Sequence, residues 1–121
     1  FGGIDILVNN AGIQHVAKVD EFPDDKWERV LSINLSSSFY AIKAALPHMR
    51  AKGFGRIINV ASIAAYAGQG ASLGYSPSKG AIKLFTQSLA QELARQASER
   101  VDSLLQEQNA ATRKRHPKRF R

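Results

Sequence analysis

The chain of 121 residues is long enough for one domain of ordinary size, and its 44% hydrophobic and 22% charged residues are typical of a globular protein. It has no apolar run that could cross a membrane, no segment resembling a secretory signal, and no Cys for a disulfide or a thiolate metal site. We therefore expect a cytoplasmic protein that does not associate with membranes.

The positive charge is concentrated in the last quarter of the chain. Residues 1–94 hold nine Lys/Arg and seven Asp/Glu, a net charge of +2. Residues 95–121 hold eight Lys/Arg and three Asp/Glu, a net charge of +5. The basic clusters Arg113–Arg115 and Lys118–Arg121 could bind anionic partners. Such clusters are more often simply solvated, so nucleic-acid binding is a minor alternative.

The first expected element is a strand, Ile4–Asn9, which is rich in β-branched residues and apolar on both faces. This pattern predicts a parallel strand that is buried on both sides. Because Phe1, rather than Met, leads directly into this strand, we expect the chain to be an internal part of a longer domain.

A helical segment follows after a loop. Its start is predicted at Asp20–Pro23, because Pro suits the first helical turn and Asp24 and Asp25 would favour the helix dipole. The serines at 36–38 interrupt the amphipathic spacing, so the pattern allows one helix or two abutting helices, which end at Gly53. The apolar positions of this segment are Trp27, Val30, Leu31, Leu35, Phe39, Ile42, Ala45, Leu46 and Met49.

A second strand, Ile57–Val60, precedes a loop over Ser62–Gly74 and a second helix that begins at Tyr75. The helical spacing continues to about Ala110, although an end at Arg95 is the alternative. Strand, helix, strand, helix in this order predicts an α/β fold: part of a doubly wound, Rossmann-like parallel sheet. We expect a core over residues 1–95 and a helical extension with a basic tail over residues 96–121.

Tyr75 and Lys79 are spaced i and i+4, which places both side chains on one face of a helix. A free phenol has a pKa of about 10 and is a poor base at neutral pH, but a nearby cation stabilises the phenolate. Such a pair can exchange a proton with an alcohol or a ketone. Ser62 follows the second strand, at the edge where ligands bind in open α/β sheets, and could orient a substrate oxygen.

Each of these features alone is weak, because a Tyr and a Lys at this spacing are common and a Ser after a strand is usually a turn residue. Together they resemble the short-chain dehydrogenase/reductase family. The resemblance rests on Asn9–Gly12 at the end of a strand, Asn34, Ser62, and Tyr75 with Lys79. It covers about residues 1–95.

The resemblance implies the role of each catalytic residue. Tyr75 would be the acid/base, and Lys79 would stabilise its phenolate, contact the nicotinamide ribose and feed a proton relay. Ser62 would position the substrate oxygen, and Asn34 would hold a relay water through its backbone. The cofactor would be NAD or NADP, in contact with Asn10, Ala11 and Gly12 as well as with Tyr75 and Lys79.

The resemblance also implies parts that are not found in the chain. The glycine-rich turn that binds pyrophosphate would precede Phe1, and no Pro-Gly turn follows the second helix. We therefore expect that the chain alone neither folds stably nor turns over substrate, since a two-stranded assembly is marginal. Complete relatives would pair their long helices in homo-oligomers. The choice between NAD and NADP stays open, as does the choice between truncation and a frameshift for the divergent tail.

The substrate is expected to be a secondary alcohol or a ketone. Residues 1–14 resemble the 3-hydroxybutyrate dehydrogenase branch, in which the residue at Gln14 contacts the substrate carboxylate. That branch would have His and Lys where this chain has Ala64 and Ser72. The three His are far apart in sequence, so no metal site is expected. The alternative function is a catalytically inactive remnant that binds anionic partners through its basic tail.

Overall fold

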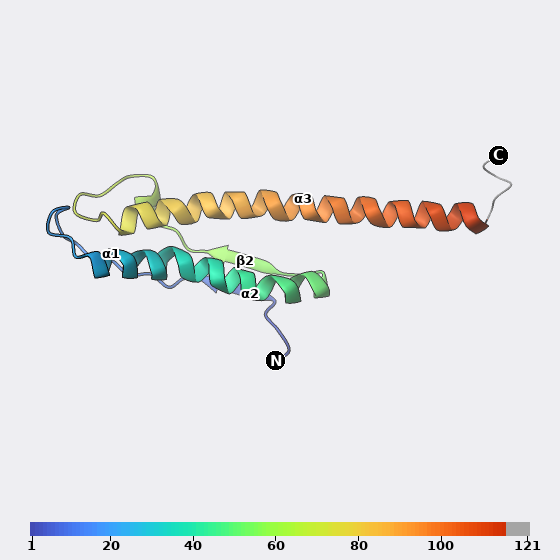
Figure 1. Ribbon diagram of the computed structural model, residues 1–121, viewed down its shortest axis with the longest axis horizontal. Helices are drawn as coiled ribbons and strands as arrows, with labels where there is room; N and C mark the ends of the chain where they lie inside the picture. The colour runs from blue at the N-terminus through green and yellow to red at the C-terminus, as the bar shows by residue number, and fades with distance from the viewer. Residues whose placement is uncertain (116–121) are drawn as a thin grey trace. The chain divides into compact units, whose positions relative to one another are not determined.

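The computed structural model describes the backbone of residues 1–115 and the side chains of residues 1–99, 103 and 106. The chain divides into two units, Phe1–Thr86 and Gln87–Arg121, and the expected catalytic residues all lie in the first. In chain order the elements are β1 (Ile6–Asn9), α1 (Asp24–Leu31), a π-helical turn η1 (Ser32–Ser36), α2 (Ser37–Lys52), β2 (Arg56–Asn59), a 3₁₀ turn η2 (Ile63–Ala65) and α3 (Tyr75–Arg115). Figure 1 labels α1, α2, β2 and α3 and colours the chain by residue number.

The two strands form a parallel sheet, as their order with the helices predicts. The register pairs Ile6 with Arg56 and continues to Asn9 opposite Asn59. The α/β class and the partial Rossmann-like arrangement are therefore confirmed.

Burial of both strand faces, which the apolar pattern alone predicts, is wrong for this chain, because its two long helices cover little more than one face of so narrow a sheet. Side chains alternate between half-buried and exposed along each strand. Ile6, Val8 and Ile58 remain 57%, 52% and 43% exposed. Successive side chains of a strand point to opposite faces: the half-buried Asn59 bonds Thr86 of α3, whereas Ile6, Val8 and Ile58 lie on the face that stays exposed.

The segment between the strands is helical throughout, with a change of helix type in its middle. α1 begins after Pro23, and its first turn carries Asp24 and Asp25. The serines at 36–38 do not end the helix; instead the backbone widens into η1 and continues as α2. α2 ends at Gly53, whose φ of 73° lies in the left-handed region that favours glycine.

α3 extends from Tyr75 to Arg115, so the alternative end at Arg95 is wrong and the helix passes the expected end near Ala110. Within the described residues, no helix combines the length and the apolar character needed to cross a membrane. The side chains of the basic clusters Arg113–Arg115 and Lys118–Arg121 lie outside the described residues, so anion binding by the tail stays a prediction.

Candidate active site

The expected catalytic residues come from segments that meet at one edge of the sheet. β1 and β2 are parallel, so the segments that follow Asn9 and Asn59 leave the sheet on the same side. The first carries Asn10–Gly12, and the second carries Ser62 before α3 begins at Tyr75. This is the edge at which open α/β sheets bind their ligands.

Lys79 is almost fully buried at this edge, with only 4% of its surface exposed. Its Nζ donates a hydrogen bond of 2.9 Å to the carbonyl oxygen of Val60. A Cβ atom added at Gly12 would lie 3.3 Å from the same Nζ, so glycine at this position lets the backbone approach the amine closely. An ammonium group has three donors, and the other two of Lys79 have no protein acceptor among the described residues. A buried cation with unused donors fits a polar ligand such as a ribose hydroxyl.

Tyr75 lies one helical turn before Lys79, on the same side of α3. The Nζ of Lys79 is 5.8 Å from the centre of the Tyr75 ring, as the i, i+4 spacing predicted. The hydroxyl of Tyr75 makes no hydrogen bond within the described residues, and its approach to Ser62 stays a prediction. The phenol is half-buried and therefore accessible to a ligand.

Ser62 has a local structural role as well as its expected catalytic one. It caps the 3₁₀ turn η2, and its Oγ accepts a hydrogen bond of 3.2 Å from the Ala64 backbone N–H. The hydroxyl proton of Ser62 is not used by any described residue, so the side chain can still donate to a substrate oxygen.

Asn34 lies in the π-helical turn and is 2% exposed. Its amide accepts a 2.8 Å hydrogen bond from the Ile13 N–H and donates to the Ile13 carbonyl at 2.9 Å and to the Ser78 Oγ at 3.0 Å. These contacts occupy both amide hydrogens of the side chain and one acceptor site of its oxygen. Single π-helical turns within α-helices are often found at functional sites.

Gln14 contacts Ser72, which precedes Tyr75 by one turn. The Nε2 of Gln14 donates to the Oγ of Ser72, which is 3% exposed. Gln14, an expected substrate contact, therefore meets Ser72 through a neutral hydrogen bond.

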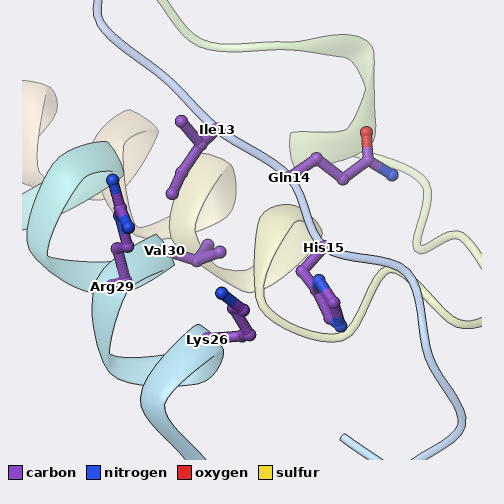
Figure 2. Close-up of a pocket in the computed structure, with 6 residues that line it drawn as sticks. All are labelled: Ile13, Gln14, His15, Lys26, Arg29 and Val30. Carbon is purple, nitrogen blue, oxygen red and sulfur yellow. The ribbon is translucent and has the colours of Figure 1, made fainter. Parts of the chain in front are cut away.

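A basic hollow of about 270 Å³ lies between the Ile13–His15 segment and α1. Figure 2 shows that Gln14 points away from the Lys26 and Arg29 side chains that line it. Gln14 borders this hollow as well as contacting Ser72, whereas Tyr75 and Lys79 are not among the residues that line it.

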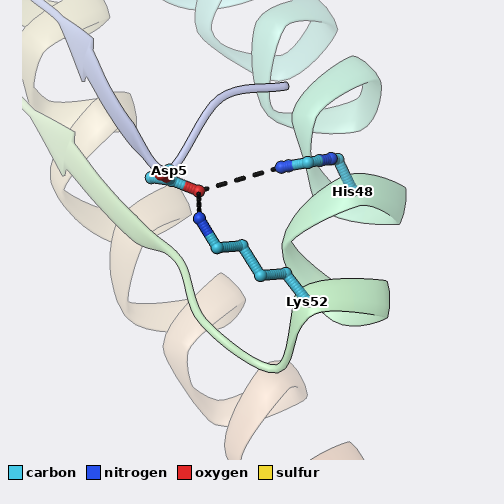
Figure 3. Close-up of polar contacts among 3 residues, drawn as sticks. All are labelled: Asp5, His48 and Lys52. Carbon is cyan, nitrogen blue, oxygen red and sulfur yellow. Dashed lines mark hydrogen bonds and ion pairs between the residues drawn. The ribbon is translucent and has the colours of Figure 1, made fainter. Parts of the chain in front are cut away.

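A charged cluster at the amino end of β1 is structural. The Nζ of Lys52, in the last turn of α2, lies 2.7 Å from Oδ1 of Asp5, and Nε2 of His48 lies 3.8 Å from the same oxygen (Figure 3). The hydrogen bond from Lys52 lowers the pKa of the Asp5 carboxyl, with a smaller contribution from His48. The cluster connects the start of β1 to the end of α2, at the sheet edge opposite the candidate active site.

Several polar residues of the site were not predicted from the sequence. The Asn9 side chain donates to Asn59 across the strands at 2.8 Å, and Asn59 donates to Thr86 of α3 at 2.9 Å. Ser78, which is fully buried, joins Asn34 to the first turn of α3. The sequence does show polar residues at strand ends and on an otherwise apolar helix face, which indicates that they have polar partners. Those partners are 27 to 50 residues away, so the sequence alone does not identify them.

Comparison with known proteins decides the family. The profile of the family described as short chain dehydrogenase matches residues 1–103, which is most of the chain. The chain belongs to the short chain dehydrogenase family. The match continues past Arg95, where the resemblance in the sequence was expected to end.

Individual short chain dehydrogenases match the same part of the chain. The D-beta-hydroxybutyrate dehydrogenase of Rhizobium meliloti is 47% identical over 94 residues, 78% of this chain and 36% of that protein. The 2-dehydro-3-deoxy-D-gluconate 5-dehydrogenase of Bacillus subtilis is 45% identical over 91 residues, 75% of this chain and 36% of that protein. The chain therefore spans little more than a third of the length of these relatives.

Solved structures of short chain dehydrogenases share the fold. A gluconate 5-dehydrogenase from Burkholderia cenocepacia, solved in complex with NADP and tartrate, superimposes with a TM-score of 0.74 at 39% identity. The alignment covers 78% of this chain and 37% of that protein. A putative gluconate dehydrogenase from Agrobacterium tumefaciens superimposes with a TM-score of 0.73 at 36% identity.

Proposed function

We propose that this chain carries the proton-transfer and substrate-orienting part of an NAD(P)-dependent oxidoreductase site, which interconverts a secondary alcohol and a ketone. The observation that carries the proposal is the position of the Lys79 amine. It is buried at the carboxyl edge of the sheet, bonded to the Val60 carbonyl, next to Gly12 and beside the Tyr75 ring.

In this proposal Tyr75 and Lys79 move the proton. The phenol of Tyr75 donates its proton to a ketone oxygen, or accepts the proton of an alcohol in the reverse direction. In the proposal Lys79 assists this transfer from its buried position, where its Nζ lies 5.8 Å from the centre of the Tyr75 ring. The backbone of Asn34 is proposed to hold a water that returns the proton to Lys79.

Ser62 and Gln14 are proposed to bind the substrate. The unused hydroxyl proton of Ser62 hydrogen-bonds the reacting oxygen and orients it toward Tyr75. Gln14, held by Ser72, contacts the remainder of the substrate through its amide. This pair is neutral, which suits a hydroxyl or a carbonyl group of the substrate as well as a carboxylate.

The cofactor is proposed to be NAD or NADP, whose nicotinamide supplies or accepts the hydride. The residues that would hold it are Asn10, Ala11 and Gly12 after β1, with Tyr75 and Lys79 from α3. The two unused donors of Lys79 and the space left by glycine at position 12 are the features of this chain that fit such a cofactor.

The test uses a chimaera, because we expect the chain alone to fold marginally and not to turn over substrate. Residues 1–94 replace the matching segment of the Rhizobium meliloti enzyme, and oxidation of a panel of secondary alcohols is followed by NADH or NADPH absorbance. Lys79→Met should lower turnover by at least about 100-fold. Lys83→Met is the matched control, because Lys83 lies one turn further along α3 and contacts the exposed Tyr66 ring instead. An equal effect of both changes would refute the proposal.

A further inference from the structure

Ser78 has contacts that its place in a helix does not explain. The residue is completely buried. Its Oγ donates to the Tyr75 carbonyl oxygen at 2.7 Å, a local bond that serines in helices often make. The same Oγ accepts a hydrogen bond of 3.0 Å from Nδ2 of Asn34, which is 44 residues away in sequence and belongs to another helix. Ser78 is therefore a junction between two elements.

The other bonds of Asn34 extend this junction to the loop that follows β1. Both backbone groups of Ile13 are bonded to the Asn34 amide, and Ile13 lies directly between Gly12 and Gln14. A continuous set of hydrogen bonds thus runs from the Ile13 backbone through Asn34 and Ser78 to the Tyr75 backbone. Every member of this set is at least half-buried, so water competes weakly for these bonds.

We propose that Ser78 is a positioning residue. Its hydrogen bond holds the first turn of α3 against the Asn34 amide. Through this contact it sets where Tyr75 and Lys79 lie relative to the loop over Gly12–Gln14. The inference rests on the proposed function, in which these are the residues that touch cofactor and substrate. Packing alone would be served as well by alanine, which has the higher helix propensity and needs no buried partner. A displacement of a catalytic group by about 1 Å can cost about 100-fold in rate.

The kinetic test compares Ser78→Ala with Ser76→Ala in the chimaera. Ser76 lies in the same turn and is also buried, but its Oγ only accepts a long bond of 3.4 Å from Gln69. Ser78→Ala should lower kcat about 10- to 100-fold, with less than about a twofold change in the KM of the cofactor. Ser78→Thr keeps the hydroxyl and should restore most of kcat. Equal kcat values for Ser78→Ala and Ser76→Ala, or a Thr variant as slow as the Ala variant, would overturn the inference.

A second measurement separates this inference from the proposed function. In the chimaera, which contains all of these residues, hydrogen exchange at the Ile13 amide and at the Asn34 side-chain amide is followed by NMR. Ser78→Ala should accelerate exchange at both groups at least about tenfold and leave that of Ile42, in the core of α2, unchanged. Ser78→Cys, whose thiol forms only weak hydrogen bonds, replaces the Ala variant if that variant does not fold. If exchange is unchanged in Ser78→Ala, the proposed positioning role of Ser78 is refuted, even when the chimaera is active. If exchange is faster but the chimaera is inactive, only the proposed function is refuted.

Discussion

Removal of the Asn34 amide should destabilise the protein more than any other single asparagine change at the site. In Asn34→Ala the N–H and the carbonyl of Ile13 both lose their partner, and Ser78 loses a donor. A buried polar group left unpaired costs about 1–3 kcal/mol. Because Ile13 is only half-buried and water can reach part of its backbone, we expect a total loss of about 2–4 kcal/mol in the free energy of unfolding.

Asn34→Asp is the more selective change. The carboxylate can still accept from the Ile13 N–H, but it cannot donate to the Ile13 carbonyl, which would then face a negative charge. We expect this variant to be at least as unstable as Asn34→Ala at neutral pH. The comparison distinguishes loss of the donated bonds from loss of packing volume, because Asp and Asn have nearly the same size.

The assay is urea unfolding of the chimaera, followed by circular dichroism. Asn10→Ala is the matched control, since Asn10 is exposed, and it should change stability by less than about 0.5 kcal/mol. If Asn34→Ala also changes the free energy of unfolding by less than about 0.5 kcal/mol, the reasoning is refuted.

Three further changes test other parts of the account. Gly12→Ala should weaken cofactor binding in the chimaera, measured by NADH fluorescence, because the new Cβ would crowd Lys79 Nζ at 3.3 Å. Gly53→Ala should cost about 1 kcal/mol of stability in the urea assay, because φ at this position is 73° and alanine is strained there. The lowered pKa of Asp5 means that its bond with Lys52 stabilises the fold above the ordinary carboxyl pKa of 3.8 and is lost as pH falls below it. The difference in Tm between the wild type and Asp5→Asn should therefore disappear toward pH 3; a constant difference would contradict this.

The sequence predicted the elements and the class of fold because these depend on local patterns. Apolar β-branched runs before Asn9 and Asn59 predicted two strands, and their alternation with helices predicted a parallel pairing, which the register confirms. The burial of those strands was not predictable in the same way. Exposure of Ile6 and Ile58 depends on which other elements cover the sheet, and a strand's own sequence does not contain that information.

The polar network around the site also could not be read from the sequence. A π-helical turn over Ser32–Ser36 lies where the serines predicted a weak point, and the amide of Asn34 within it bonds the backbone of Ile13. The i, i+4 spacing did predict that Tyr75 and Lys79 share a face, because that relation is local to one helix. The contacts of Ser78 with Asn34 and of Gln14 with Ser72 join residues 44 and 58 positions apart, which only the tertiary fold brings together.

The most direct test of the central claim is the rate of turnover in Tyr75→Phe. In the chimaera this change removes one hydroxyl group and its transferable proton, and it leaves the ring beside Lys79 in place. Turnover should fall by at least about 1,000-fold, while the dissociation constant of NADH changes by less than about threefold. Tyr66→Phe, at a ring that is 74% exposed, is the control and should keep full turnover. A Tyr75→Phe enzyme that retains most of its turnover would show that Tyr75 is not the acid/base of this site.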